Sequence, residues 1–341
     1  MKKFVEYEDK RTVFNEVAAR SGLPVTSVEK DFWVTWTLKE LFNLPGWGDA
    51  LTFKGGTSLS KGWKLIERFS EDIDVVIDKE KLGFGGEEAP DKAPSKKQVK
   101  KRIEGLKSAA QSCVKNDIQP LLESVIRSEM TEDINWKLYL DDLDPDKQTL
   151  LFEYPTVFPG EGNYVKQVVK IEMGARSDTA PAEQIKIQSI VEENVPALFS
   201  GTTIEIQTVS PKRTFWEKAL LLHEERFRPE DRMIKAGMAR HYYDVYQMVI
   251  KGVSTKAIDD ITLFNQIVSH RKVYFKYGWV DYTTMIPSEL CLIPSDDQMK
   301  YWAADYENMR DEMFYGEVPT FDEILKTVQQ FQEELNKRST Q

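Results

Sequence analysis

Residues 51–77 contain the pattern that most constrains how this chain can fold. A short apolar stretch (51–53) leads into two glycines and two hydroxyl residues (55–58), and residues 72–77 form a second apolar stretch that carries two aspartates. The two apolar stretches favour β-strands, and residues 58–67 favour a short helix between them. Asp72 and Asp74 are two positions apart, so on a strand their carboxylates share one face. The pattern predicts a strand, a glycine turn, a helix and a second strand.

The glycine turn and the aspartates together point to one kind of chemistry. Backbone N–H groups at a glycine-rich helix start bind anions such as phosphates. Paired carboxylates hold Mg²⁺, the cofactor that we expect, with Mn²⁺ as an alternative. This combination predicts a magnesium-dependent transfer from a nucleoside triphosphate (NTP). The alternative without a function is that Asp72 and Asp74 are ordinary charged residues on the solvated face of a strand. The predicted nucleotide-binding residues are Gly55, Gly56, Thr57, Ser58, Ser70 and Arg240.

A third carboxylate is a candidate for the same metal site. In the predicted strand around residues 168–172, Lys170 and Glu172 share a face by alternation. If this strand lies beside the two aspartates, Glu172 completes a metal site with Asp72 and Asp74. The alternative is that Glu172 forms an ordinary cross-strand ion pair.

Composition excludes several classes of protein. The chain has 341 residues, enough for two domains, and a net charge of −10, which argues against nonspecific coating of nucleic acid. Its 2 cysteines, Cys113 and Cys291, lie far apart and form neither a metal-binding pattern nor a disulfide framework. No apolar signal core begins the chain, and no run approaches the roughly 20 apolar residues of a membrane helix. We therefore expect a soluble cytoplasmic protein that does not contact the membrane.

The periodicity along the chain predicts an α+β protein with one boundary. Helices are expected over residues 9–20, 24–42 (capped by Thr26 or Ser27) and 97–127, where Pro120 would kink or split the helix. Residues 79–97 resemble a mobile loop. Strands are expected over residues 135–140, 149–153, 164–173, 184–190 and 203–208. The chain reads as mainly helical after residue 210, so we place a sheet-bearing domain with N-terminal helices at 1–210 and a helical domain at 211–341.

Two helices of the second domain carry further candidates. Ser210 and Pro211 form a favourable helix start. Lys218 lies at the edge of an apolar stripe and is a candidate for neutralising a triphosphate, although a lysine there is usually an ordinary surface residue with a buried stem. Arg240 and Asp244 lie one helical turn apart. They form either a routine ion pair or part of a half-buried site.

Three motifs resemble one known family, the AbiEii/AbiGii nucleotidyltransferase toxins of abortive-infection type IV systems, which include the MenT-type toxins. Residues 55–74 are similar to the family's GGT-[AS]-L…R-x-S-x-D-x-D motif, residues 215–223 (FWEKALLLH) to its second motif, and residues 240–244 (RHYYD) to R-[DH]-x-Y-D. The first motif alone is shared across the polymerase-β-like superfamily. Order and spacing agree over about residues 25–250.

The resemblance implies a polymerase-β-like nucleotidyltransferase domain with a mixed sheet, followed by a mainly helical C-terminal domain that completes the active-site cleft. It implies that Asp72 and Asp74 are metal ligands, Lys218 a phosphate ligand and Asp244 a further catalytic residue. Family members add nucleotides to tRNA 3′ ends, which blocks translation, and a cognate protein antitoxin opposes them. On this basis we expect an NTP-dependent nucleotidyltransferase (EC 2.7.7 type) that acts on RNA, specifically tRNA.

Two other functions remain open at this stage. The same chemistry can nucleotidylate a protein or a small-molecule hydroxyl, or the chain can be a nucleotide-binding interaction protein without turnover. Residues after about 250 match no motif. A basic and aromatic stretch there is either a surface helix or a site for single-stranded RNA; it comprises Arg271, Lys272, Tyr274, Phe275, Lys276 and Tyr277.

Overall fold

The computed structural model describes residues 2–70, 72–131, 134–160, 167–199, 203–314 and 317–338. The chain divides into two compact units. Unit 1 comprises Met1–Gly62 and Glu71–Thr208, and unit 2 comprises Trp63–Ser70 and Val209–Gln341. The segment Trp63–Ser70, which precedes the paired aspartates, thus belongs to unit 2. The predicted single boundary near residue 210 places this segment in the first domain instead.

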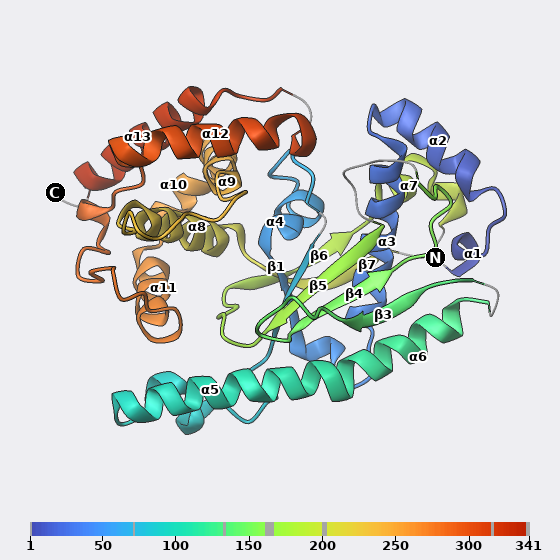
Figure 1. Cartoon of the computed structure of the whole chain (residues 1–341), viewed down its shortest axis with the longest axis horizontal. Helices are drawn as coiled ribbons and strands as arrows, with labels where there is room; N and C mark the ends of the chain where they lie inside the picture. The colour runs from blue at the N-terminus through green and yellow to red at the C-terminus, as the bar shows by residue number, and fades with distance from the viewer. Residues whose placement is uncertain are drawn as a thin grey trace. The chain divides into compact units, whose positions relative to one another are not determined.

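Unit 1 is built on a seven-stranded mixed sheet with the strand order β3-β4-β5-β2-β1-β7-β6 (Figure 1). The central strand β2 pairs antiparallel with β1 and parallel with β5, and β1 pairs parallel with β7. This confirms the predicted α+β class with a mixed sheet. The strands are β1 (Leu51–Lys54), β2 (Ile73–Ile77), β3 (Lys137–Leu140), β4 (Thr149–Glu153), β5 (Val168–Gly174), β6 (Ala182–Ile187) and β7 (Ile204–Val209).

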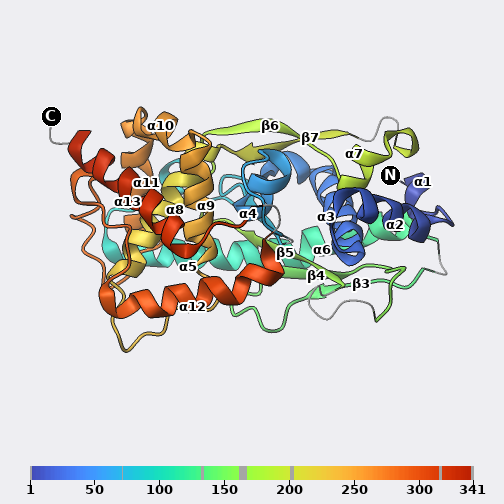
Figure 2. The same cartoon turned by 90° about the horizontal axis from the view of Figure 1, so that it is seen from above.

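Helices cover the sheet of unit 1. In both views α1, α2, α3 and α7 gather near the N-terminus, while α5 and α6 run end to end along the sheet (Figures 1 and 2). Trp33 and Trp36 of α3 pack against Phe152 of β4, with ring centroids 6.1 and 5.7 Å apart. The helices are α1 (Lys2–Val5), α2 (Lys10–Ser21), α3 (Val25–Phe42), α4 (Gly55–Thr57), α5 (Lys96–Cys113), α6 (Gln119–Glu129) and α7 (Ile190–Asn194).

Several predicted boundaries in unit 1 are wrong. The helix predicted over residues 58–67 is only a π-helical turn, Ser58–Gly62, and the long helix predicted over 97–127 is divided by a second π-turn, Val114–Ile118. Pro120 lies in the first turn of α6, where its missing N–H costs no helical hydrogen bond. Neither Thr26 nor Ser27 caps α3, because both are buried inside it and Pro24 holds the N-cap position.

The other two predicted segments differ less from the observed structure. Residues 79–97 contain two short 3₁₀ helices, Gly86–Glu88 and Pro90–Lys92, and Arg102 of α5 donates hydrogen bonds to backbone carbonyls in this segment. The strand predicted over residues 164–173 is β5, which begins at Val168. Residues 164–166 lie outside the described part of the chain.

Unit 2 is a helical unit around α8. Helix α8 packs on α9, α10 and α11. The ring of Trp216 in α8 lies 4.9 Å from that of Phe264 and 6.3 Å from that of Phe331. The segment Trp63–Ser70 joins this unit through a 2.6 Å hydrogen bond from the N–H of Phe69 to the carbonyl of Met313. The helices are α8 (Pro211–Arg226), α9 (Arg240–Ile250), α10 (Val253–Ile258), α11 (Ile261–Tyr274), α12 (Asp296–Met313) and α13 (Phe321–Arg338).

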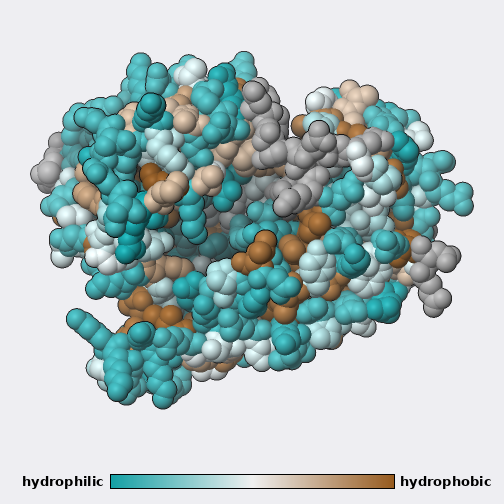
Figure 3. Space-filling model, in the orientation of Figure 1, coloured by the Kyte–Doolittle hydropathy of each residue, from teal (hydrophilic) through white to brown (hydrophobic). Residues whose placement is uncertain are grey.

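None of the helices in the described residues has the length and apolar character needed to cross a membrane. The face of the molecule seen in Figure 3 is largely hydrophilic, and hydrophobic residues appear on it in separate areas.

A buried ion pair in unit 1 gives a stability prediction. Lys39 Nζ of α3 lies 2.5 Å from Oε1 of Glu192 in α7, and both side chains are at most 5% exposed. We expect Lys39→Met to lower the free energy of unfolding by about 3–5 kcal/mol, because it leaves a buried carboxylate without its cation. Urea unfolding of the variant measures this loss. The double variant Lys39→Met/Glu192→Gln should recover part of it, and an unchanged midpoint in the single variant would contradict the prediction.

Candidate functional site

The glycine turn brings the backbone against one of the predicted metal ligands. Gly55 has a φ of +80°, and a Cβ at this position would lie 1.9 Å from Oδ2 of Asp74. Glycine is therefore required twice, once for the backbone conformation and once for the approach of the carboxylate. The hydroxyl of Thr57 donates to the carbonyl of Asp72 at 2.5 Å, and that of Ser58 donates to the carbonyl of Gly55 at 2.8 Å. Both hydroxyls thus stabilise the turn, and they are buried rather than directed outward.

The predicted third carboxylate lies beside the aspartates. In the register of the sheet Asp74 is flanked by Lys54 on β1 and by Glu172 on β5. The neighbouring strand was a condition of the prediction, and it is fulfilled. Glu172 also forms an ion pair, but with Lys170 of its own strand and not across strands as the alternative expected. Asp72 precedes the first residue of β2 rather than lying on the strand.

The carboxylates of unit 1 repel one another. The pKa of Asp74 is raised to about 7, first by burial and then by the charges of Glu172 and Asp72 and a hydrogen bond with Glu172, whereas Lys54 acts against the shift. An ionised Asp74 is therefore unfavourable in this structure unless positive charge is added next to it.

The donor atoms of this group fit Mg²⁺. Within the described residues, no group of three or more His, Cys, Asp and Glu side chains is arranged to hold a metal ion. Mg²⁺, however, commonly binds through one or two carboxylates and completes its shell with water and substrate phosphates. The hydrogen bond between Asp74 and Glu172 shows that their oxygens approach closely enough to share one cation. Asp74 and Glu172, with Asp72 next to them, are the residues that would hold Mg²⁺.

A pocket of about 250 Å³ opens at these carboxylates. Asp74, Glu172 and Lys54 line it, together with Ser177, whose hydroxyl accepts a 3.0 Å hydrogen bond from Lys54 Nζ. The pocket thus offers acidic oxygens, the ammonium group of Lys54 and the hydroxyls of Thr149 and Ser177 in unit 1, which suits a ligand that carries both a metal ion and phosphate oxygens.

Unit 2 contains a second group of predicted residues, organised around Asp244 of α9. This carboxylate is fully buried and accepts two hydrogen bonds from Arg68, at 2.7 Å from Nε and 2.8 Å from Nη2. Lys218 Nζ of α8 lies 2.8 Å from Oδ2 of the same carboxylate. Burial by itself raises the pKa of Asp244, but the charges and hydrogen bonds of Arg68 and Lys218 outweigh burial and lower it. Asp244 is therefore an anion fixed between two cations.

His241 extends this group. Its Nδ1 lies 3.2 Å from Lys218 Nζ. Burial, followed by the charges of Lys218 and Arg240, holds the pKa of His241 well below its usual value, so the ring is neutral. An ammonium group only donates, so Nδ1 accepts and Nε2 carries the proton. We call Arg68, Lys218, Arg240, His241 and Asp244 the cation cluster. Arg68 and Lys218 pair with Asp244, and the charge of Arg240 acts on Lys218 and His241.

The cation cluster corrects two expectations. Asp244 pairs with Arg68 and Lys218 rather than with Arg240 of its own helix, so the routine ion pair one turn apart is wrong. Lys218 is 8% exposed and forms an ion pair with Asp244, so it is not an ordinary surface lysine. Ser70, a predicted nucleotide-binding residue, lies in the segment Trp63–Ser70 of unit 2, whereas the glycine turn lies in unit 1.

The structure also adds residues that were not predicted as part of a site. Arg68, the first residue of the R-x-S-x-D-x-D motif, binds Asp244 from a position 176 residues away. Its position in this motif was the one sequence signal that could have identified Arg68 as a site residue. Lys54 directly precedes the glycines, and His241 lies between the two predicted residues of RHYYD. No spacing rule connects residues so far apart in sequence, so only the fold brings them together.

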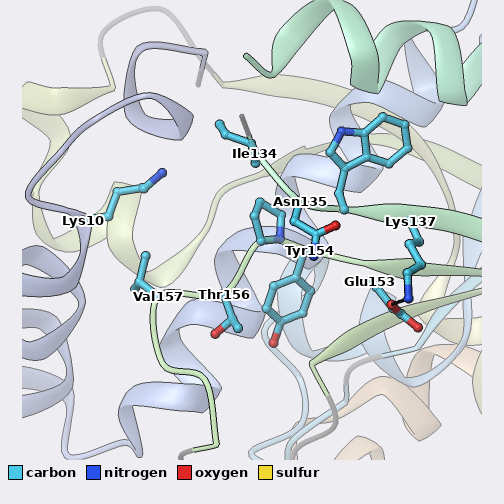
Figure 4. Close-up of a pocket in the computed structure, with 10 residues that line it drawn as sticks. Lys10, Ile134, Asn135, Lys137, Glu153, Tyr154, Thr156 and Val157 are labelled. Atoms are coloured by element: carbon cyan, nitrogen blue, oxygen red, sulfur yellow. Dashed lines mark ion pairs between the residues drawn. The ribbon is translucent and has the colours of Figure 1, made fainter. Parts of the chain in front are cut away.

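A second pocket in unit 1, of about 390 Å³, contains none of the predicted site residues (Figure 4). Lys10, residues 134–137 and residues 153–157 line it. Lys137 and Glu153 form a 3.2 Å ion pair at its side, and Thr156 donates a 2.6 Å hydrogen bond to the buried Glu29. These polar groups are already paired with one another, and we assign no ligand to this pocket.

The raised pKa of Asp74 gives a pH-dependent prediction. Asp74 binds a proton up to about pH 7 in the folded chain, compared with its ordinary pKa of 3.8, so the folded state loses stability as the pH rises through this window. Asp74→Asn cannot ionise and escapes that loss. We expect its melting temperature, measured without divalent cations, to exceed that of the unmodified chain at pH 8, and the difference to shrink towards pH 4. The exposed control Asp49→Asn should follow the unmodified chain, and parallel curves for Asp74→Asn would refute the assignment.

The cation cluster gives a stability prediction of its own. Asp244→Ala removes the single carboxylate and leaves Arg68 and Lys218 buried and mutually repulsive, so we expect the free energy of unfolding to fall by about 3–5 kcal/mol. Lys218→Met should cost less, because Arg68 still binds both oxygens of Asp244. Chemical denaturation of both variants tests this order, and equal stability of Asp244→Ala and the unmodified chain would contradict it.

Comparisons with known proteins can now be set beside this geometry. A family model described as nucleotidyl transferase AbiEii toxin, type IV TA system, matches residues 36–327. A comparison with curated proteins found no match. Among solved structures, JHP933 from Helicobacter pylori is 12% identical, with 91% of this chain and 90% of that chain covered and a TM-score of 0.40. MenT4, a nucleotidyltransferase toxin from Mycobacterium tuberculosis H37Rv, is 14% identical, with 93% and 98% covered and a TM-score of 0.40.

The family match extends over most of the chain and includes all three predicted motifs. It covers the glycine turn and aspartates of unit 1 as well as the helices that carry Lys218 and Asp244. The chain belongs to the AbiEii nucleotidyltransferase toxin family of type IV toxin–antitoxin systems.

Proposed function

We propose that this toxin transfers a nucleoside monophosphate from an NTP to the 3′ end of an RNA, specifically a tRNA, and that this modification blocks translation. In the reaction the 3′-hydroxyl oxygen of the acceptor bonds to the α-phosphorus, the bond from that phosphorus to pyrophosphate breaks, and the hydroxyl proton passes to water. The observations that carry the proposal are the carboxylate group of unit 1 and the cation cluster of unit 2, since carboxylates bind metal ions and cations bind phosphates.

The residues of unit 1 serve the metal side of this reaction. Asp72, Asp74 and Glu172 hold Mg²⁺, which when bound neutralises phosphate charge and activates the phosphorus. The backbone of the turn at Gly55 and Gly56 binds phosphate oxygens, because the hydroxyls of the following two residues are directed to the backbone. The role of the turn is thus assigned to its N–H groups rather than to its hydroxyls.

The cation cluster serves the phosphate side. Asp244 pairs with both Arg68 and Lys218, and the charges of Arg68 and Arg240 disfavour the charged form of the buried Lys218. A triphosphate would add negative charge beside Lys218. Asp244 is a positioning residue in this proposal, since both of its oxygens are occupied by Arg68 and Lys218. The phosphate ligands are then Lys218 and Arg240.

The family membership brings two partners into the proposal. A type IV system pairs its toxin with a cognate protein antitoxin, and a nucleotidyltransferase needs a nucleotide. We propose that both apply to this chain and that it acts in the cytoplasm, where tRNA and NTPs occur together.

A labelling experiment tests the acceptor and the chemistry at once. The purified chain is incubated with Mg²⁺, total RNA and each α-labelled NTP in turn, and RNA and protein are separated on a denaturing gel. We expect label in an RNA band of tRNA size. Label in protein or in a small molecule would show that this molecule, and not RNA, is the acceptor. Nucleotide binding without label transfer would show that the chain is a nucleotide-binding interaction protein without turnover.

Variants in the same assay test the assigned roles. We expect Asp74→Ala to abolish transfer and Lys218→Ala to lower the single-turnover rate by about 10²–10³-fold, because Lys218 stabilises charge that develops on pyrophosphate. Asp49→Ala, which changes an exposed carboxylate, is the matched control and should retain full activity. Transfer at the normal rate by Asp74→Ala would refute the metal-site assignment.

A further inference from the structure

The basic and aromatic stretch of residues 271–277 is only partly a surface. Arg271 donates to Glu224, with Nε 2.9 Å from Oε1, and the ring of Tyr274 is 4% exposed. Both residues belong to the core of unit 2 and cannot bind a macromolecule. Lys272 and Lys276 are exposed, and Tyr277 is half-buried. Arg271 and Tyr274, two of the six residues that the sequence suggested for RNA, are therefore unsuitable, and the structure offers different ones.

Next to this stretch, two aromatic rings and two arginines form one stack. The rings of Tyr277 and Trp279 are 4.5 Å apart and inclined by 20°. The guanidinium carbon of Arg228 lies 5.1 Å from the ring centre of Trp279, and that of Arg232 lies 4.8 Å from it. We call these four residues the arginine–tryptophan stack. Guanidinium groups on an aromatic face are typical of surfaces that bind bases and phosphates together.

Hydrogen bonds and an ion pair with neighbouring residues hold the stack in place. The N–H of Tyr277 donates a 3.0 Å hydrogen bond to the hydroxyl of Tyr282, which lies 3.3 Å from Oε1 of the buried Glu224. Arg228 Nε lies 2.5 Å from Oε2 of Glu225. A preformed surface loses little conformational entropy when a ligand binds, so this support favours recognition.

Arg232 is the part of the stack that is open to a ligand. Its side chain is exposed, and its guanidinium lies against the ring of Trp279 together with that of Arg228. Glu225 already balances the charge of Arg228, so Arg232 is the cation of the stack that a ligand anion meets. The indole Nε1 of Trp279 is buried with no hydrogen-bond acceptor among the described residues. The same is true of Trp33, Trp36 and Trp302, so this feature by itself does not mark a site.

The two arginines of the stack lie on the connection between the helices that carry Lys218 and Asp244. Residues 227–239 join α8, which carries Lys218, to α9, which carries His241 and Asp244. Lys218 is eight residues before the end of α8, which is about 12 Å along a helix. Exposed charges of both signs lie close to the stack in sequence, with Arg232, Lys272 and Lys276 alongside Glu230, Asp231 and Asp281. The cations for RNA phosphates are therefore individual residues such as Arg232, not a patch of net positive charge.

We propose that the arginine–tryptophan stack binds the single-stranded segment that precedes the acceptor end of the RNA. Unpaired bases stack on the outer faces of Tyr277 and Arg232, and Arg232 and Lys276 contact the phosphates. The proposal rests on the proposed function in that it takes RNA as the acceptor. It adds the surface that holds this acceptor and the structural feature that is recognised, unpaired bases.

Fluorescence anisotropy tests the stack on the full chain. The probe is a short fluorescein-labelled single-stranded oligoribonucleotide, and an unlabelled RNA duplex is the competitor. We expect Trp279→Ala and Arg232→Ala each to weaken binding by about 10-fold, within the range for loss of one stacked base. The matched control is Trp136→Ala in unit 1, where Arg127 lies 5.5 Å from the ring centre, and this variant should bind like the unmodified chain. Arg232 is exposed, so its variant keeps the test valid even if Trp279→Ala unfolds.

The outcomes separate this inference from the proposed function. Equal affinities of Arg232→Ala and the unmodified chain, or equally strong competition by the duplex, would overturn the role of the stack. Absence of oligoribonucleotide binding by the unmodified chain would overturn it too. Transfer of label to RNA is measured independently in the gel assay. Transfer that persists while the stack variants bind normally would leave the proposed function intact and refute only the stack.

Discussion

The fully buried carboxylate of Asp244 is the interaction on which unit 2 depends. It joins three pieces of chain that are far apart in sequence: the segment Trp63–Ser70 through Arg68, α8 through Lys218, and its own helix α9. A buried charge is tolerated only when it is paired and fully hydrogen-bonded, and here two cations satisfy both oxygens. Asp244 thus ties these three pieces of chain together, and the proposed function assigns the phosphates to Lys218 and Arg240 of the same cluster.

Unit 1 shows the opposite electrostatic problem. Asp74 lies between the turn at Gly55 and the parallel strand β5, where Glu172 faces it in register. The sheet forces these carboxylates together, and burial together with their mutual repulsion raises the pKa of Asp74 to about 7. Folding thus gathers carboxylates in unit 1 and cations in unit 2. In the proposed function a metal ion adds positive charge to the first group, and phosphates add negative charge to the second.

The sequence predicted the elements whose signals are local. The glycine turn followed by Asp72 and Asp74, the hydrophobic periodicity of α2 and α3, and the short apolar strands all depend on neighbours within a few residues. The α+β class with a mixed sheet was therefore predictable, and the family match confirms the resemblance carried by the motifs. The errors occurred where packing overrides a local preference. The predicted helix over residues 58–67 stops at Gly62, because residues 63–70 leave unit 1 and join unit 2.

The sequence by itself determined which residue types the site contains and their order along the chain, because turn chemistry and strand alternation act over short distances. Only the tertiary structure decided their partners. A parallel strand pair places Glu172 beside Asp74. Asp244 forms ion pairs with Arg68 and Lys218 and not with Arg240. Arg271 and Tyr274 lie in the core and not on the surface. Each of these outcomes depends on contacts between residues tens to hundreds of positions apart. Burial, which sets the pKa values and the cost of an unpaired charge, exists only once the chain has folded.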